Sequence, residues 1–209
     1  MRKLFVISTL FILSVLIITS CINFTSMYKK GKYDLAVYQA VKKIRKNPKE
    51  KYIAVLKKSY PIANQEDLDR IKFLKMEGKP DIWDEVFERY QKLKDRQDLV
   101  KTVTPIKYSG GTLDFKIVDY DADIIAAKKK AAEYFYVHSK KLIESNNRFA
   151  ARQSYNELLR INDYYPNYKD VNTLLKKALA KGTTFVYLDD ENNTHFKLNI
   201  IISKRFISI

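Results

Sequence analysis

The sequence predicts a mostly α-helical protein with one short β-hairpin insert and a second β-hairpin near the C-terminus. Apolar residues recur at helical spacing over most of the chain, which indicates helices with one buried face. Five glycines and five prolines among 209 residues leave few interruptions between these faces. Hydrophobic residues at 46% and aromatic residues at 13% can build a packed core, so a disordered chain is not expected.

The N-terminal stretch has the organisation of a secretory signal. Two basic residues precede the apolar run Leu4–Ile18, and small residues then lead to Cys21. The apolar run is too short to span a bilayer comfortably. We therefore expect residues 1–20 to be a cleaved signal peptide, with an uncleaved N-terminal helix as the alternative.

The run Ile18-Thr19-Ser20-Cys21 resembles the bacterial lipobox, in which an aliphatic residue and two small residues precede an invariant cysteine. This resemblance implies that Cys21 is diacylated on sulfur and becomes the mature N-terminus. Cys21 is the only cysteine in the chain, which excludes a disulfide framework. Two acyl chains anchor a protein stably. We expect residues 21–27 to be a lipidated tether in the cell envelope, at the outer membrane in preference to the inner.

The formal net charge is +15, and the excess is concentrated close to the expected anchor. Between Tyr28 and Tyr60, eleven Lys and Arg residues are opposed only by Asp34 and Glu50, which gives a net charge of +9. Such a segment near a lipid anchor favours contact with anionic lipid through residues 28–60, and a solvated helix face is the alternative. Lysine greatly outnumbers arginine, which together with an exported location argues against a nucleic-acid partner.

The first helix after the tether opens at Gly31–Ala36 and stops at Asn47-Pro48, because the residue before a proline avoids the helical region. The spacing of Gly31, Tyr33, Ala36 and Pro48 resembles the second helix of a tetratricopeptide repeat. Lys43 departs from that pattern, since the repeat usually has alanine there. The resemblance implies an α-solenoid, in which helix pairs stack to bury their apolar faces.

Three further helices are expected within residues 28–100. One starts at Pro48 and should end or kink at Tyr60-Pro61. Asn64 is predicted to cap the next helix, which ends at Gly78 and directs Leu68, Ile71 and Leu74 inward. Pro80 opens the last one. It carries the only tryptophan, Trp83, which we expect to be buried because Trp83, Val86, Phe87 and Tyr90 repeat the first-helix spacing of the repeat.

The helical pattern fails over residues 101–120. Pro105 and the turn Ser109–Thr112 separate two short stretches with apolar residues, which predicts a β-hairpin or an extended loop. An insert on a helical scaffold often carries recognition. An ordinary packed connector is the alternative.

Residues 121–182 are expected to form a second set of repeat helices. The first is capped by Asp121 or Asp123 and runs to about Ser145, the second begins near Arg148, and the last extends from Asp170 to Gly182. The residues predicted to face the core are Ile124, Ala127, Ala131, Phe135, His138 and Leu142 of the first helix, Ala151, Tyr155 and Leu158 of the second, and Val171, Leu174, Leu175 and Ala178 of the last.

The C-terminal residues 183–209 change to strand periodicity. Apolar and polar residues alternate on both sides of the polar turn Asp189–Thr194, which predicts a β-hairpin tail. This hairpin either packs on the last helices or begins a domain that the chain lacks, and we favour truncation.

The sequence offers no arrangement typical of an enzyme. The two histidines, His138 and His195, are far apart in the chain, and His138 lies on an apolar stripe, where a hydrogen-bonded core histidine is the usual role. There is no glycine-rich phosphate loop and no serine-nucleophile elbow. We therefore expect neither catalytic residues nor a cofactor.

The alternating aspartates of Asp119–Asp123 are similar to the start of a calcium-binding loop. Ile124 stands where such a loop needs glycine, and Lys130 stands where it needs the bidentate glutamate. Negative charge at a helix N-terminus explains the aspartates without a metal. A calcium site is therefore not expected.

The chain as a whole resembles a family of uncharacterised Bacteroidetes-type lipoproteins with helical repeats, whose members extend further at the C-terminus. The stretches that carry this resemblance are Tyr28–Asp34, Ile71–Lys75, Val118–Asp121 and Tyr165–Val171. The family implies no reaction and no ligand. We expect a membrane-anchored adaptor or assembly factor that binds envelope proteins through its helices. The alternative is a surface lipoprotein that binds a glycan or another ligand through the 101–120 insert.

Overall fold

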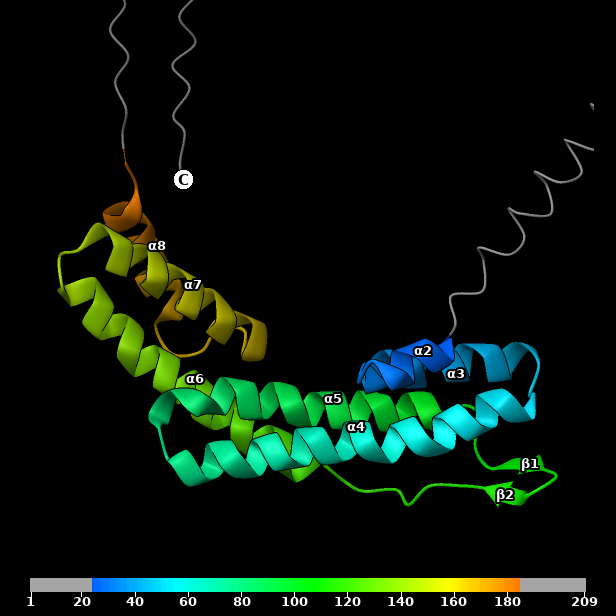
Figure 1. The fold of residues 1–209 in the computed structure, drawn as a ribbon. Helices are drawn as coiled ribbons and strands as arrows, with labels where there is room; N and C mark the ends of the chain where they lie inside the picture. Colours follow the sequence, from blue (N-terminus) through cyan, green and yellow to red (C-terminus); the bar gives the residue numbers. More distant parts are fainter. Residues whose placement is uncertain (1–23, 185–209) are drawn as a thin grey trace, which may run out of the picture. The chain divides into compact units, whose positions relative to one another are not determined.

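The computed structural model describes residues 24–184, which form seven α-helices, one 3-10 turn and a two-stranded antiparallel sheet (Figure 1). The elements are α2 (Phe24–Lys29), α3 (Tyr33–Lys46), α4 (Glu50–Glu77), η1 (Pro80–Ile82), α5 (Trp83–Lys101), β1 (Ile106–Tyr108), β2 (Gly111–Leu113), α6 (Asp121–Glu144), α7 (Arg148–Tyr164) and α8 (Val171–Gly182). The expectation of a mostly helical protein with a small hairpin insert is confirmed.

Two parts of the sequence interpretation lie outside the described residues. They are the signal segment with Cys21, and the predicted hairpin tail from residue 185 onward. Within the described range, no helix combines the length and the apolar character that crossing a bilayer requires. The chain divides inside α6 into two compact units, Met1–Ala126 and Ala127–Ile209, and each is described by itself.

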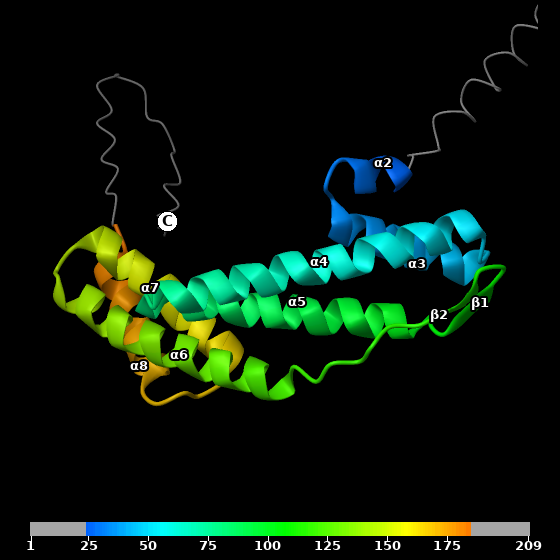
Figure 2. The same ribbon diagram turned by 60° about the horizontal axis from the view of Figure 1, so that its bottom comes forward.

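The core of the first unit lies between α3, α4 and the hairpin. Figures 1 and 2 both show α4 and α5 side by side, with the hairpin beside the end of α4 that is nearer α3. α3 is amphipathic and ends at Asn47, as the following proline predicts. The core residues are Ala36, Val37, Ala40, Val41 and Ile44 of α3, Ile53, Val55, Leu56 and Tyr60 of α4, Val100 of α5, and Ile106 and Leu113 of the hairpin.

α4 is a single helix of 28 residues with Pro61 inside it, so the helix does not end at Tyr60-Pro61, which was one of the two predicted outcomes there, and the predicted cap at Asn64 is wrong. The inward stripe continues across the proline, because Leu56, Tyr60 and Ala63 are followed at helical spacing by Asp67, Ile71 and Leu74, all buried. Burial of this continuous stripe outweighs the backbone hydrogen bond that proline removes. Asp67 takes the inward position, and the neighbouring Leu68, expected inside, is 37% exposed.

The turn between α4 and α5 follows the sequence signals, but the buried residue is one position away from the predicted one. Gly78 has φ +66° and its N–H bonds to the Leu74 carbonyl, so it ends α4 as expected. Ile82 is 6% exposed, whereas Trp83 is only half-buried. The expected burial of Trp83 is therefore wrong. The inward face of α5 runs from Ile82 through Val86 and Tyr90, each four residues after the last, and Trp83 lies one position off that line.

The insert is a short hairpin that packs on the first unit. α5 extends to Lys101, so the hairpin covers less than the predicted 101–120 segment. Ile106 pairs with Leu113 across the two strands, and both side chains are buried in the core. Gly111 has φ +113°, a conformation that L side chains rarely adopt, which explains the glycine-rich turn. The packed-connector interpretation therefore describes the apolar residues of the insert.

The second unit contains most of α6 together with α7 and α8. α6 buries a line of small residues, so Ala127, Ala131 and Ser139 lie inside with Ile143, while the predicted core residues Phe135, His138 and Leu142 are only half-buried. Small side chains let α7 approach closely: Ser139 and Ser154 are both 0% exposed, and the Ser154 hydroxyl donates to the Ser139 carbonyl at 3.0 Å. On α7 and α8 the predicted positions Ala151, Leu158, Val171, Leu174 and Ala178 are buried, whereas Tyr155 and Leu175 are half-buried.

The N-termini of α7 and α8 are held by different kinds of contact. Asn147 caps α7, because its side-chain oxygen accepts from the N–H groups of Phe149 and Ala150. Asp170 occupies the cap position of α8 without a side-chain hydrogen bond to that helix. Its carboxylate instead accepts from the Tyr136 hydroxyl at 2.7 Å. A partner on another helix has replaced the local cap.

Candidate interaction surface

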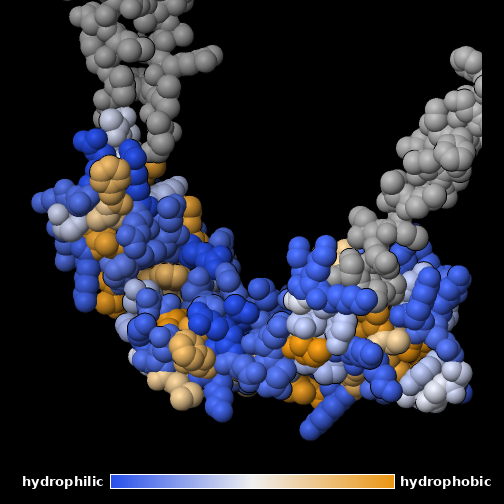
Figure 3. Space-filling model, viewed as in Figure 1, coloured by the Kyte–Doolittle hydropathy of each residue, from blue (hydrophilic) through white to orange (hydrophobic). Residues whose placement is uncertain are grey.

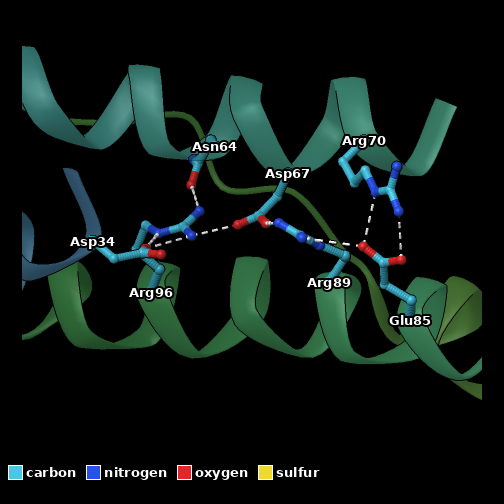
Figure 4. Close-up of polar contacts among 7 residues, drawn as sticks. All are labelled: Asp34, Asn64, Asp67, Arg70, Glu85, Arg89 and Arg96. Carbon is cyan, nitrogen blue, oxygen red and sulfur yellow. Dashed lines mark hydrogen bonds and ion pairs between the residues drawn. The ribbon is translucent and has the colours of Figure 1, made fainter. Parts of the chain in front are cut away.

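The most extensive polar cluster is a chain of ion pairs between α3, α4 and α5 (Figure 4). Arg96 of α5 donates to Asp34 of α3 at 2.6 Å, to Asn64 of α4 at 2.6 Å, and also to Asp67. Arg89 donates to Asp67 at 2.8 Å. Because each buried charge in this cluster has an opposite charge or a hydrogen-bond partner, the cluster holds three helices together and offers no unpaired group for chemistry.

The outer end of the same cluster is a bidentate pair. Arg70 donates to both carboxylate oxygens of Glu85 at 2.8 Å, and Arg89 donates to one of them at 3.1 Å. These contacts, with the Arg70 hydrogen bonds the larger cause, lower the pKa of Glu85 from 4.5 to about 2. With so low a pKa, the Glu85 carboxyl group is deprotonated near neutral pH and cannot donate a proton there. The role of this pair is structural.

The aspartates of Asp119–Asp123 are neutralised by protein groups. Lys94 donates to Asp121, and Lys75 lies 3.9 Å from Asp123. Asp119 accepts from the Asp121 N–H at 2.9 Å, as in a turn that precedes a helix. Within residues 24–184, no group of three or more metal-ligating side chains is close enough to hold an ion.

His138 is held by a carboxylate, in agreement with the hydrogen-bonded role that the sequence suggested. Its Nδ1 lies 2.9 Å from Glu157 Oε2, and its ring stacks on Tyr134. The side chain is 32% exposed, so it lies at the edge of the core and not inside it. His195 lies outside the described residues.

The turn between α7 and α8 carries a second charged cluster. Lys169 has φ +44°, lies 4.3 Å from the ring centre of Tyr136, and forms an ion pair with Glu133 at 2.9 Å. The hydrogen bonds of Lys169 and then Tyr168 lower the pKa of the Glu133 carboxyl. All of these groups are satisfied by one another, so the cluster fixes the turn against α6.

Within residues 24–184, three cations where α8 ends beside the start of α7 contact neutral groups and not carboxylates. The guanidinium groups of Arg148 and Arg152 both donate to one neutral atom, the hydroxyl oxygen of Thr184, at 3.1 Å each. Arg152 also donates to the Gly182 carbonyl at 2.9 Å. Among the described residues, Lys181 donates to the Ile143 carbonyl and to Asn146 Oδ1. Across the described part of the chain, no carboxylate lies within ion-pairing distance of these three cations.

Two hollows adjoin these cations. The first, of about 350 Å³, lies between α7 and α8 and is lined by Arg152, Tyr155, Asn156, Ala178, Leu179, Gly182 and Thr183. The second is lined by Asn146, Asn147, Arg148, Phe149 and Lys181. Phe149 is 76% exposed and Leu179 is 46% exposed, so each hollow has an accessible apolar side chain at its edge. We call Arg148, Phe149, Arg152, Leu179 and Lys181 with both hollows the α7–α8 surface.

Gly182 gives this geometry the room it uses. A Cβ atom at this position would lie 3.1 Å from Arg152 Cγ, closer than the neighbouring side chain normally allows. Glycine therefore lets the end of α8 lie against Arg152, which can then reach the Gly182 carbonyl. Gly182 was predicted only as the end of the last helix, and the structure adds this contact.

Comparison with known proteins gives no further assignment. The chain matches no protein-family model, no curated protein and no solved structure. Function must therefore be argued from the described residues. Sequence reasoning did not identify the α7–α8 surface. The spacing of Arg148 and Arg152 places them on one helix face. Only the structure shows that Thr184, after the end of α8, lies where both guanidinium groups can donate to its hydroxyl.

Proposed function

We propose that this protein is a lipid-anchored envelope scaffold that binds an acidic, partly apolar segment of another envelope protein on the α7–α8 surface. One observation carries the proposal: Arg148 and Arg152 converge on a single neutral oxygen, beside a mainly apolar hollow and a second, more polar one that Phe149 lines. A carboxylate is the preferred partner of paired guanidinium groups. Phe149 and Leu179 would contact apolar side chains of the same segment.

The anchor is part of the same proposal. The lipobox-like run that ends at Cys21 supports an acyl-modified N-terminus and an envelope location. Tetratricopeptide-like packing of the helices is likewise proposed. It is supported by Ala36 and Ala151, the small residues at matching repeat positions, which are both 0% exposed. Repeat scaffolds of this kind act as adaptors or assembly factors, and no catalytic role is proposed.

The alternative, ligand binding through the 101–120 insert, has less support. A recognition loop presents side chains to solvent, whereas Ile106 and Leu113 of the insert lie 7% and 6% exposed in the core. The 101–120 segment does expose Ile117 and Val118, at 51% and 39%, but the buried Ile106 and Leu113 tie the strands of the hairpin to the core of the first unit. We therefore assign partner binding to the α7–α8 surface.

Site-specific photo-crosslinking in intact cells tests the binding site. A photoreactive phenylalanine analogue at Phe149 should give a discrete crosslink to an envelope protein, at a segment with Asp or Glu beside apolar residues. The double variant Arg148→Gln/Arg152→Gln should lose most of that crosslink. The control Lys176→Gln/Lys177→Gln removes the same charge from exposed positions of α8 and should keep it. Equal crosslinking in both variants, or a basic contact segment, would refute the assignment.

Metabolic labelling tests the anchor separately. An alkynyl fatty acid should label the wild-type protein and leave Cys21→Ser unlabelled, because serine offers no sulfur for the acyl group. Equal labelling of the two proteins would disprove lipidation at Cys21 without touching the α7–α8 assignment.

A further inference from the structure

The basic residues of the 28–60 segment are all exposed, and within residues 24–184 they have no acidic partners. The eleven are Lys29, Lys30, Lys32, Lys42, Lys43, Arg45, Lys46, Lys49, Lys51, Lys57 and Lys58. Arg45 donates to the hydroxyl of Thr102, and Lys57 lies 3.4 Å from the Tyr108 hydroxyl, both neutral groups. Among the described residues, none of the eleven lies within ion-pairing distance of a carboxylate. Asp34, one of the two acids of the segment, is paired with Arg96 instead.

Residues 61–126 of the first unit have a negative net charge, and most of their cations are paired. Residues 61–126 contain eleven Lys and Arg residues and fourteen Asp and Glu residues, a net charge of −3. Seven of these cations form ion pairs, namely Arg70, Lys75, Lys79, Arg89, Lys94, Arg96 and Lys101. The unpaired positive charge of the unit is therefore concentrated on α2, α3 and the start of α4.

Two apolar side chains lie in the middle of this positive charge. Leu35 and Tyr38 of α3 are 40% and 49% exposed. With Lys42 and Lys46 they recur at i, i+3, i+7 and i+11, so the four share one helix face. That face is opposite to the one that buries Ala36, Val37, Ala40, Val41 and Ile44. Figure 3 shows mostly hydrophilic surface around α3, with isolated apolar patches.

We propose that the outer face of α3 binds the surface of a bilayer that contains anionic lipid. The lysines and Arg45 would lie among the lipid phosphates, while Leu35 and Tyr38 enter the interface between headgroups and acyl chains. Tyrosine suits that depth, since its ring is apolar and its hydroxyl remains in contact with water. The biological setting rests on the proposed anchor, which would tether residues just before α2 to the membrane.

An acidic protein is the other class of partner that a basic surface could bind. The lipid surface fits better, because the cations extend over three elements and the apolar pair stands alone on a convex helix face. A protein partner needs a shaped site, and the hollow beside α3, lined by Asp34, Val37, Lys92, Asp95, Arg96 and Leu99, contains two acids and lies on the side toward α5.

Vesicle sedimentation tests the inference with the unlipidated mature chain, residues 21–209 with Cys21→Ser. It should bind vesicles of phosphatidylglycerol and phosphatidylcholine, ignore vesicles of phosphatidylcholine alone, and be released by high salt. Lys42→Gln/Arg45→Gln/Lys46→Gln should weaken binding at least about tenfold. Leu35→Ser/Tyr38→Ser should weaken it severalfold while leaving the salt dependence unchanged.

The matched control is Lys72→Gln/Lys107→Gln/Lys116→Gln, which removes three exposed cations from the acid-rich part of the same unit. It should bind nearly as wild type does. Equal loss in both triple variants, or binding that does not depend on lipid charge, would overturn the inference. Binding to soluble polyglutamate without binding to anionic vesicles would assign the face to an acidic protein instead. Because this protein carries no acyl chain, a failure here leaves the labelling result at Cys21 unaffected.

Discussion

Arg96 of α5 and Asp67 of α4 form an ion pair inside the first unit, and each side chain is only 4% exposed. The same guanidinium reaches Asp34 of α3 at 2.6 Å, so one residue connects three helices. A buried charge is tolerated only with a partner, because water no longer solvates it. The pair therefore makes the relative position of α4 and α5 specific.

Removing the negative charge should be strongly destabilising. Asp67→Asn leaves Arg96 and Arg89 without their shared carboxylate, and we expect the free energy of unfolding to fall by about 3 kcal/mol. Denaturant titration followed by the fluorescence of Trp83 measures this, since the only tryptophan lies in the first unit. Asp69→Asn, an exposed change two residues away, should cost less than about 0.5 kcal/mol. Similar losses in the two variants would contradict the role of Asp67.

The Arg70–Glu85 pair predicts a dependence of stability on pH. The pKa of Glu85 falls from 4.5 to about 2 on folding, so its ionised form stabilises the folded state above about pH 4.5. That contribution should be lost progressively as the pH falls toward about 2. Because the Glu85 side chain is 34% exposed, we expect about 1–2 kcal/mol after solvent screening. The difference in unfolding free energy between wild type and Glu85→Gln should shrink below pH 4.5, and a constant difference would argue against the pair.

Close packing of α6 on α7 predicts a size limit at Ser154. The side chain is fully buried against Ser139, so Ser154→Leu should force the helices apart and cost about 1–3 kcal/mol or more. Ser154→Ala should cost about 1 kcal/mol, since it removes only the hydrogen bond. Hydrogen exchange of α6 and α7 amides measures both effects. Gln153→Leu, at the neighbouring exposed position, should leave exchange unchanged.

The hairpin insert should contribute to the stability of the first unit. Leu113 is 6% exposed and pairs with Ile106, so Leu113→Ala should lower the free energy of unfolding by about 2–3 kcal/mol. Thr112→Ala changes an exposed side chain of the same strand and should be nearly neutral. If Leu113→Ala were equally neutral, the insert would be a free loop, and the ligand-binding alternative would regain support.

Local signals in the sequence were enough to predict most of the helical segments and where several of them end. Pro48 and Gly78 act on their own backbone or on the residue beside them, so their effects do not depend on the rest of the fold. The turn Ser109–Thr112 predicted the hairpin for the same reason. The net charge of residues 28–60 is also a property of the sequence alone.

Packing between helices decided the remaining features. Pro61 lies inside one continuous helix because burial on both sides of it outweighs a local backbone defect. Ile82 is buried in place of Trp83, and Ser139 in place of Phe135. The distance between packed helices determines which side chain fits in the core, and the sequence does not give that distance. Arg96 meets Asp34 and Asp67 from 62 and 29 residues away, and the guanidinium groups of Arg148 and Arg152 meet at Thr184. Which charges are paired, and which lack an acidic partner within residues 24–184, depends on contacts between segments distant in the sequence, and only the folded chain brings those segments together.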